Sequence, residues 1–299
     1  MKQSKYSIKI IVAFAAIYLI WGSTYLAIKF AIETIPSFFM AAIRFLIAGA
    51  ILFTFSRIKG KFKIEPIHWK SSFIVGGLLL LGGNGGVVWA EKVVPSGLTA
   101  LLVSTVPIWV VIISLIIRSE EKPTLKQILG ICLGFIGLFF LISPENLLRG
   151  ESINLTGAIV LLGATLSWSI GSIYTKHAIF PESQILTVAL QMLAGGFLLF
   201  LLSLVSGEIF TLDISLVSLK SFISLLYLIA LGSVIAFTAY IWLLKNVGAA
   251  KTTTYAYVNP VVAVFLGWAL AGETLDFKII ISSIVIISAV VLITINKKN

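Results

Sequence analysis

Residues 9–29 read KIIVAFAAIYLIWGSTYLAIK, and the charged residues of this stretch are the lysines at its two ends. An apolar run of about 20 residues has the length that an α-helix needs to cross the hydrocarbon layer of a membrane. The run continues into Trp21-Gly-Ser-Thr-Tyr25 without a small-residue cleavage site, which argues against a secretory signal peptide. We therefore expect a retained transmembrane helix here.

The rest of the chain continues this pattern. Hydrophobic residues make up 59% of the sequence and charged residues 11%, whereas ordinary soluble domains carry roughly 25% charged residues. Further apolar stretches of spanning length occupy residues 36–55, 71–90, 98–117, 126–142, 154–175, 185–206, 220–244, 252–271 and 278–295. The sequence therefore predicts an all-α membrane protein with ten transmembrane helices and excludes a soluble domain. The single Cys132 offers no disulfide framework and no thiol metal site.

The basic residues indicate how the chain is oriented. With the N-terminus inside, the inner segments hold 16 of the 22 lysines and arginines, and the outer segments hold five. Cytoplasmic loops normally carry such an excess, so we expect both termini in the cytoplasm. The same rule accounts for the net charge of +10 without a nucleic-acid partner.

The chain also contains an internal repeat. A shift of 147 residues aligns Leu19, Trp21 and Lys29 with Leu166, Trp168 and Lys176, and a shift of 153 aligns Trp89, Pro107 and Glu120 with Trp242, Pro260 and Glu273. The predicted copies cover residues 8–142 and 154–295 and together form one transmembrane domain. Because each copy has five spans, the second enters the membrane from the opposite side. Inverted repeats of this kind are the basis of many secondary transporters.

Several motifs resemble a known family. The stretches Trp21–Lys29, Arg44-Phe45 and Pro95–Trp109, with the paired Glu120 and Glu273, resemble the EamA family of the drug/metabolite transporter superfamily. Trp89-Ala-Glu91 is similar to its bacterial drug/metabolite exporter subgroup. The resemblance implies a ten-helix fold with a central cavity, and export of amino acids or other small metabolites across the bacterial inner (plasma) membrane. The second half departs from the motif, with Trp168-Ser-Ile-Gly in place of Trp21-Gly-Ser-Thr.

Polar and aromatic residues inside the spans are the candidates for a substrate site. Lipid-facing surfaces have no use for hydroxyls and amides, so such side chains point into the bundle, where they pack helices or line a wet cavity. Trp21 and Trp168 lie near the centres of their spans, away from the headgroup belts that aromatic residues favour. The predicted substrate-binding residues are Trp21, Tyr25, Asn84, Ser104, Thr105, Trp168, Ser169, Tyr240, Tyr257 and Asn259.

Two prolines are predicted to shape this site. Pro107 and Pro260 occupy equivalent positions near the middle of their spans, and each removes a backbone donor and frees a carbonyl one turn earlier, at Val103 and Ala256. We expect helix kinks that contribute to gating, with freed carbonyls beside the substrate. Glycines around Asn84 are expected to allow close helix packing.

Arg44 is the single charge well inside a predicted span. It is expected to bind a substrate carboxylate, to hold helices together, or to pair with Glu33. All acidic residues fall in predicted loops or at span ends, so we expect no embedded carboxylate to carry a proton.

These observations favour a secondary transporter. The spans lack the clustered His, Asp, Glu or Cys residues of an enzyme, so no catalytic site, metal or cofactor is expected. A P-loop is also absent, which argues against direct use of ATP. A passive channel, or a membrane sensor or scaffold, is the alternative. The expected partners are a small-molecule substrate and the lipid bilayer, with protons an open choice of coupling ion; the oligomeric state is not determined.

Overall fold

The computed structural model describes residues 2–60, 62–94, 99, 102–117, 124–141, 154–271 and 277–294. Within these residues the chain is helical and contains no strand, as the sequence predicts. The principal helices are α1 Lys2–Ala31, α2 Ser37–Lys59, α3 Pro66–Val75, α4 Gly86–Ala90, α6 Val106–Ile116, α7 Leu125–Leu141, α9 Leu155–His177, α10 Gln184–Val205, α11 Leu219–Tyr227, α12 Thr238–Val247, α13 Ala249–Thr252, α14 Tyr255–Ala271 and α15 Phe277–Thr294.

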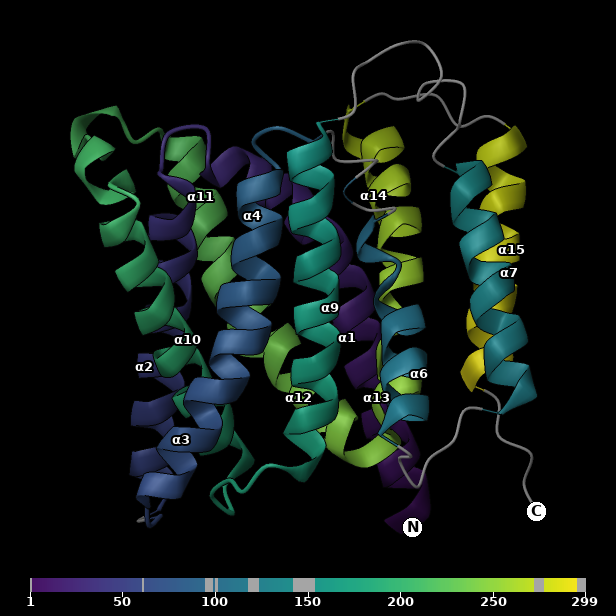
Figure 1. Cartoon of the computed structure of the whole chain (residues 1–299), viewed down its shortest axis with the longest axis horizontal. Coiled ribbons are helices and arrows are strands. Elements are labelled where there is room, and N and C mark those ends of the chain that lie inside the picture. Colours follow the sequence, from purple (N-terminus) through teal and green to yellow (C-terminus); the bar gives the residue numbers. More distant parts are fainter. Residues whose placement is uncertain are drawn as a thin grey trace.

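Many of these helices can cross a membrane. Six helical stretches of the described residues are long and apolar enough for a full span, and three shorter apolar helices accompany them. The helices run side by side in one bundle (Figure 1). The prediction of ten spanning helices in two repeats stays a prediction.

Two of the spans contain a wide-turn segment in the middle. The π-helical segment η1, Gly76–Gly85, joins α3 to α4, and the π-helical segment η4, Leu228–Phe237, joins α11 to α12. Longer π-helical stretches are rare, and π turns occur frequently at functional sites. Both segments line the cavity described below.

Small residues let the helices pack closely. A methyl group placed on Gly76 of η1 would lie 2.7 Å from the backbone nitrogen of Gly195 in α10, so these backbones touch. α10 also packs along α2, where Gly196 faces the backbone of Leu46. The hydrophobic effect contributes little to the association of helices in lipid, so close van der Waals contacts of this kind supply much of the association energy.

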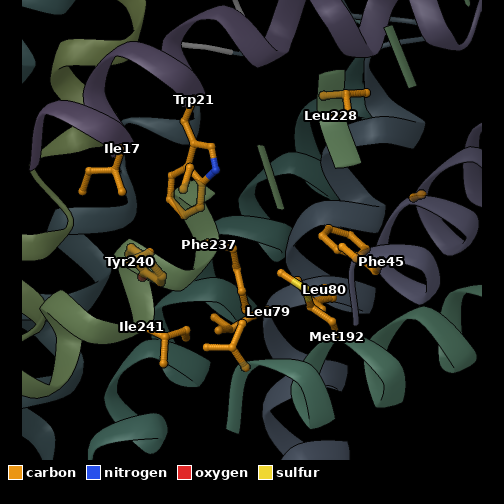
Figure 2. Close-up of a cluster of buried hydrophobic side chains, with 14 of the residues drawn as sticks. Ile17, Trp21, Phe45, Leu79, Leu80, Met192, Leu228, Phe237, Tyr240 and Ile241 are labelled. Atoms are coloured by element: carbon orange, nitrogen blue, oxygen red, sulfur yellow. The ribbon is translucent and has the colours of Figure 1, made fainter. Parts of the chain in front are cut away.

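A cluster of buried apolar side chains lies in the centre of the bundle, and several of its members also line the cavity described below. Figure 2 shows the ring of Trp21 in α1 directed toward Phe237 and Tyr240, and Leu79, Leu80 and other apolar side chains complete the cluster. α7 and α15 form a separate pair at one edge of the bundle (right in Figure 1). A second apolar cluster links this pair to α14.

Candidate functional site

A cavity lies in the middle of the bundle, between α1, α2, η1, α4, α6, α9, η4 and α14. Its walls include Trp21, Asn84 and Trp168. The volume that the centres of water molecules can occupy inside this cavity is about 80 Å³. Because about 10–15 Å³ of such volume holds one water, the cavity has room for a handful of waters or a small polar ligand.

Aromatic rings form one wall of this cavity. Trp21 lies edge-on to Trp168, with 5.7 Å between ring centroids, and edge-on to Tyr255, with 4.8 Å. Trp168 Nε1 donates to the Tyr240 hydroxyl at 2.8 Å, and Trp21 Nε1 donates to the Gly232 carbonyl at 3.1 Å. Each indole is thus held at its polar edge, which leaves its ring faces for packing or for a ligand.

Arg44 brings a positive charge to the cavity wall. Its side chain is 3% exposed, and its Nε donates to Ser233 Oγ in η4 at 2.8 Å. Its Nη1 is buried without a hydrogen-bond partner. Arg44 therefore links α2 to η4 through Nε and keeps an unused donor at Nη1.

Two amides also line the cavity. Asn84 Oδ1 is buried without a hydrogen-bond partner, so it offers an acceptor. The Asn259 side-chain amide satisfies its neighbours when its nitrogen faces two backbone carbonyls. In this orientation Nδ2 donates to the Tyr255 carbonyl at 3.0 Å and to the Tyr18 carbonyl at 3.2 Å. Asn259 is thus satisfied within the protein, whereas Asn84 has capacity left for a ligand.

The structure divides the predicted site residues into two groups. Trp21, Tyr25, Arg44, Asn84, Trp168 and Asn259 line the cavity. Ser104, Thr105, Ser169, Tyr240 and Tyr257 are not part of its lining.

The second group lies behind the wall or elsewhere. Ser169 Oγ donates to the Thr165 carbonyl at 2.7 Å, four residues earlier on its own helix. Thr105 Oγ1 donates to Thr165 Oγ1 at 3.2 Å, so it lies one side chain away from the cavity. Tyr240 accepts the hydrogen bond of Trp168 Nε1 and packs against its ring, and Tyr257 packs in the cluster between α14, α7 and α15.

The two prolines are placed differently from one another. In the first half a turn at Ser104 and Thr105 breaks the helix, and α6 begins at Val106, so Pro107 lies in its first turn. In the second half Pro260 lies inside α14. The expected mid-helix position is therefore wrong for Pro107, because the chain turns just before the proline, where the missing backbone donor costs nothing.

The structure contradicts one of the three alternatives for Arg44 and adds an observation about Glu91. Glu33 does not pair with Arg44; it accepts from Lys220 Nζ at 2.8 Å, on the surface. Glu91 lies at a span end, as expected, but both carboxylate oxygens are shielded from solvent without a hydrogen-bond partner. The expectation that acidic residues fall in loops or at span ends thus holds for Glu91, which follows the span Pro66–Ala90, and only the shielding of its oxygens was not predicted.

Other residues of the lining were not predicted. Tyr255 lies four residues before Asn259 on α14, so helical periodicity could have identified it. Thr24, Phe45 and Phe237 also line the cavity, although nothing in their local sequence distinguishes them from packing residues. Glu120, Glu273 and the start of the Pro95–Trp109 motif lie outside the described residues.

Comparison with known proteins agrees with this architecture. The sequence profile of the EamA-like transporter family matches residues 8–143 and 155–295. The chain is 40% identical over 287 residues to the "Uncharacterized inner membrane transporter YedA" of Escherichia coli (strain K12), covering 95% of this chain and 90% of that protein. It is 24% identical over 268 residues to the "Probable amino-acid metabolite efflux pump" of Salmonella typhimurium, covering 87% and 86%.

A solved structure shares the fold. A crystal structure of a protein with 18% sequence identity superposes with a TM-score of 0.75, covering 96% of this chain and 97% of that chain. The profile matches both halves of the sequence, and apolar helices and a central cavity are present. The protein is a multi-pass membrane transporter and belongs to the EamA-like transporter family.

Proposed function

We propose that the protein is a secondary transporter of the inner (plasma) membrane that exports amino acids or related small metabolites by alternating access. The observation that carries this proposal is Arg44, a buried cation with an unused donor at the wall of an aromatic cavity. A relative is named as an amino-acid metabolite efflux pump, which supports this class of substrate.

The cavity offers complementary groups to such a molecule. Arg44 Nη1 is a donor for a substrate carboxylate, and Asn84 Oδ1 is an acceptor for an ammonium or hydroxyl group. Charge-assisted hydrogen bonds of this kind contribute about 1.5–3 kcal/mol each. The faces of Trp21 and Trp168 give an apolar surface for the rest of the molecule. The substrate we propose is therefore small and carries a carboxylate.

The arrangement of the bundle supports alternating access. η1 and η4 occupy corresponding places in the two proposed repeats, and both reach the cavity. Two inverted bundles can rock about a site that both of them line and so expose it to each side in turn. We also propose that both termini lie in the cytoplasm, because the segments on that side carry most of the basic residues.

Ligand-dependent thermal stability of the purified protein tests the substrate class. Each amino acid is added singly, because a ligand that binds the folded state raises the melting temperature. Arg44→Gln should weaken binding about 10-fold or more, since it removes a charge-assisted bond, and Arg44→Lys should recover part of the affinity. Arg57→Gln is the matched control, because Arg57 lies on the same helix and is exposed. Unchanged affinity in Arg44→Gln would refute the role of Arg44.

Counterflow in proteoliposomes tests the mechanism. A carrier that alternates between two sides accelerates uptake of labelled substrate when unlabelled substrate is trapped inside. A passive channel gives no such acceleration. Acceleration that saturates with substrate supports a carrier, and its absence for a substrate that binds would favour the channel.

A further inference from the structure

Glu91 directly follows α4, which ends at the side of the bundle opposite the N-terminus (Figure 1), and it lies one turn beyond the cavity-lining residue Val87 without being part of the lining itself. It follows Ala90, the last residue of the span Pro66–Ala90, and its backbone N–H donates to the Val87 carbonyl at 3.0 Å. Asn84 and Val87 line the cavity. Residues three and four apart share a helix face, so Glu91 continues the face that these two residues present to the cavity.

The carboxyl group of Glu91 is shielded but unsatisfied. The residue as a whole is partly exposed, yet both carboxylate oxygens are buried and neither has a hydrogen-bond partner. Two described acids have such partners: Glu33 pairs with Lys220, and Glu208 pairs with Lys92 and accepts from Ser37 Oγ at 2.9 Å. An ionised carboxylate without such partners is costly in a buried place.

Among the described residues, the titratable groups that interact electrostatically with Glu91 are Lys29 and Tyr25 of α1 and Arg44 of α2. Neither the Lys29 ammonium nor the Arg44 guanidinium has a nitrogen within 4.0 Å of a Glu91 carboxylate oxygen, so neither forms an ion pair with it. The segment of α9 beside α4, residues 157–164, carries no titratable side chain. Burial raises the pKa of the Glu91 carboxyl to about 8, against the opposing effects of Lys29 and Arg44.

We propose that Glu91 is a proton-exchange site of the transport cycle, and that the cavity closes only when its charge is cancelled. In the empty protein a proton cancels the charge. In the loaded protein the cationic group of the substrate does so, and this half of the proposal rests on the proposed function. Proton and substrate are then alternatives, which couples export to proton entry.

The physical reason is the loss of water on closing. When the cavity opens toward Glu91, water solvates the carboxylate, and the carboxylic acid gives its proton to a water molecule. When the cavity closes, the shielded oxygens lose that water and have no protein donor to replace it. The ion is therefore excluded from the closed state unless a proton or another cation accompanies it.

Infrared difference spectroscopy of the purified full-length protein tests the first half without any substrate. The wild type should show the C=O stretching band of a protonated carboxylic acid, and the band should disappear as pH rises, with a midpoint near 8. Glu91→Gln should lack this band, and the control Glu33→Gln should keep it. A wild-type spectrum with no band that depends on Glu91 would overturn the proposal.

Removal of a nearby positive charge provides a second test, in which the pH midpoint of the Glu91 band is measured. Arg44→Gln should move the midpoint to higher pH, because the carboxylate loses a favourable cation, and Arg44→Lys should leave it nearly unchanged. If Arg44→Gln does not fold, Lys29→Gln provides a change of the same sign. A midpoint that moves to lower pH would contradict the assignment.

Transport in proteoliposomes tests the coupling, with an equimolar mixture of amino acids as the probe. Glu91→Gln should lose accumulation driven by an imposed proton gradient, whereas the surface control Glu33→Gln should accumulate substrate as the wild type does. Gradient-driven accumulation in Glu91→Gln equal to that of the wild type would overturn the coupling role. If the wild type transports none of the mixture, the proposed substrate class fails, and the infrared result still decides whether Glu91 exchanges a proton.

Discussion

Gly83 provides a sharp test of the cavity, because it lies directly against Trp168. A methyl group placed on Gly83 would lie 2.7 Å from Trp168 Cε3, whereas ordinary contacts begin at 3.4 Å. In Gly83→Ala the indole or the η1 backbone must therefore move by about 0.7 Å or more. Trp168 resists this movement, because its Nε1 donates to Tyr240 and its ring packs against Trp21.

The magnitude follows from this crowding. Adding a methyl group to a packed interior costs typically about 1–3 kcal/mol. If this strain acts on the ligand-bound cavity, ligand affinity should fall about 5-fold to 140-fold, since each 1.4 kcal/mol is tenfold. The melting temperature should fall by several degrees, since 1 kcal/mol corresponds to roughly 2–4 °C in a chain of this size class.

The chain offers a matched control. Gly77 lies in the same π-helical segment, and a methyl group placed on it would meet Leu198 Cδ1 at 3.5 Å, an ordinary contact. Gly77→Ala should therefore leave affinity nearly unchanged. The assay measures melting temperature with and without ligand for each variant, and the double variant Gly83→Ala/Trp168→Phe should recover part of the loss, because the smaller ring frees space. Equal behaviour of Gly83→Ala and Gly77→Ala would refute this account of the cavity wall.

Three further predictions follow from the site and the charges. Asn84→Ala should weaken ligand binding several-fold, since it removes a hydrogen bond worth about 0.5–1.5 kcal/mol, with the folded protein retained in the membrane fraction; an unchanged dissociation constant in calorimetry would remove Asn84 from the site. In a cysteine-free background, Ile214→Cys should react with an impermeant thiol reagent in intact cells and Phe62→Cys should be protected; the reverse pattern would place the termini outside. Burial raises the pKa of Glu91 from its ordinary value of 4.5 to about 8, so between these pH values the folded state binds more protons than the unfolded state. The free energy of unfolding of the wild type should therefore fall with rising pH across this window, relative to that of Glu91→Gln. Melting temperatures of the two proteins that change in parallel with pH would contradict this prediction.

Composition and hydropathy were enough to predict the helices. A chain with 59% hydrophobic residues and repeated apolar runs of spanning length can satisfy its backbone in lipid as helices, so the all-α class did not depend on any long-range contact. The position of a side chain within its span also indicated some residues of the cavity wall. Trp21, Asn84 and Trp168 reach the cavity because a polar or amphipathic side chain at mid-span has few alternatives to facing the interior.

The tertiary structure decided which of those interior side chains meet the cavity. Periodicity gives the face of a residue on its own helix, but it does not say which neighbour covers that face. Ser169 satisfies its hydroxyl on its own backbone, and Tyr257 packs toward α7 and α15, so both are interior without lining the site. Glu91 is the clearest case, because a carboxylate at a span end is ordinarily hydrated. Its oxygens lose water only because helices distant in the sequence close around them, and that packing is not encoded in any local pattern.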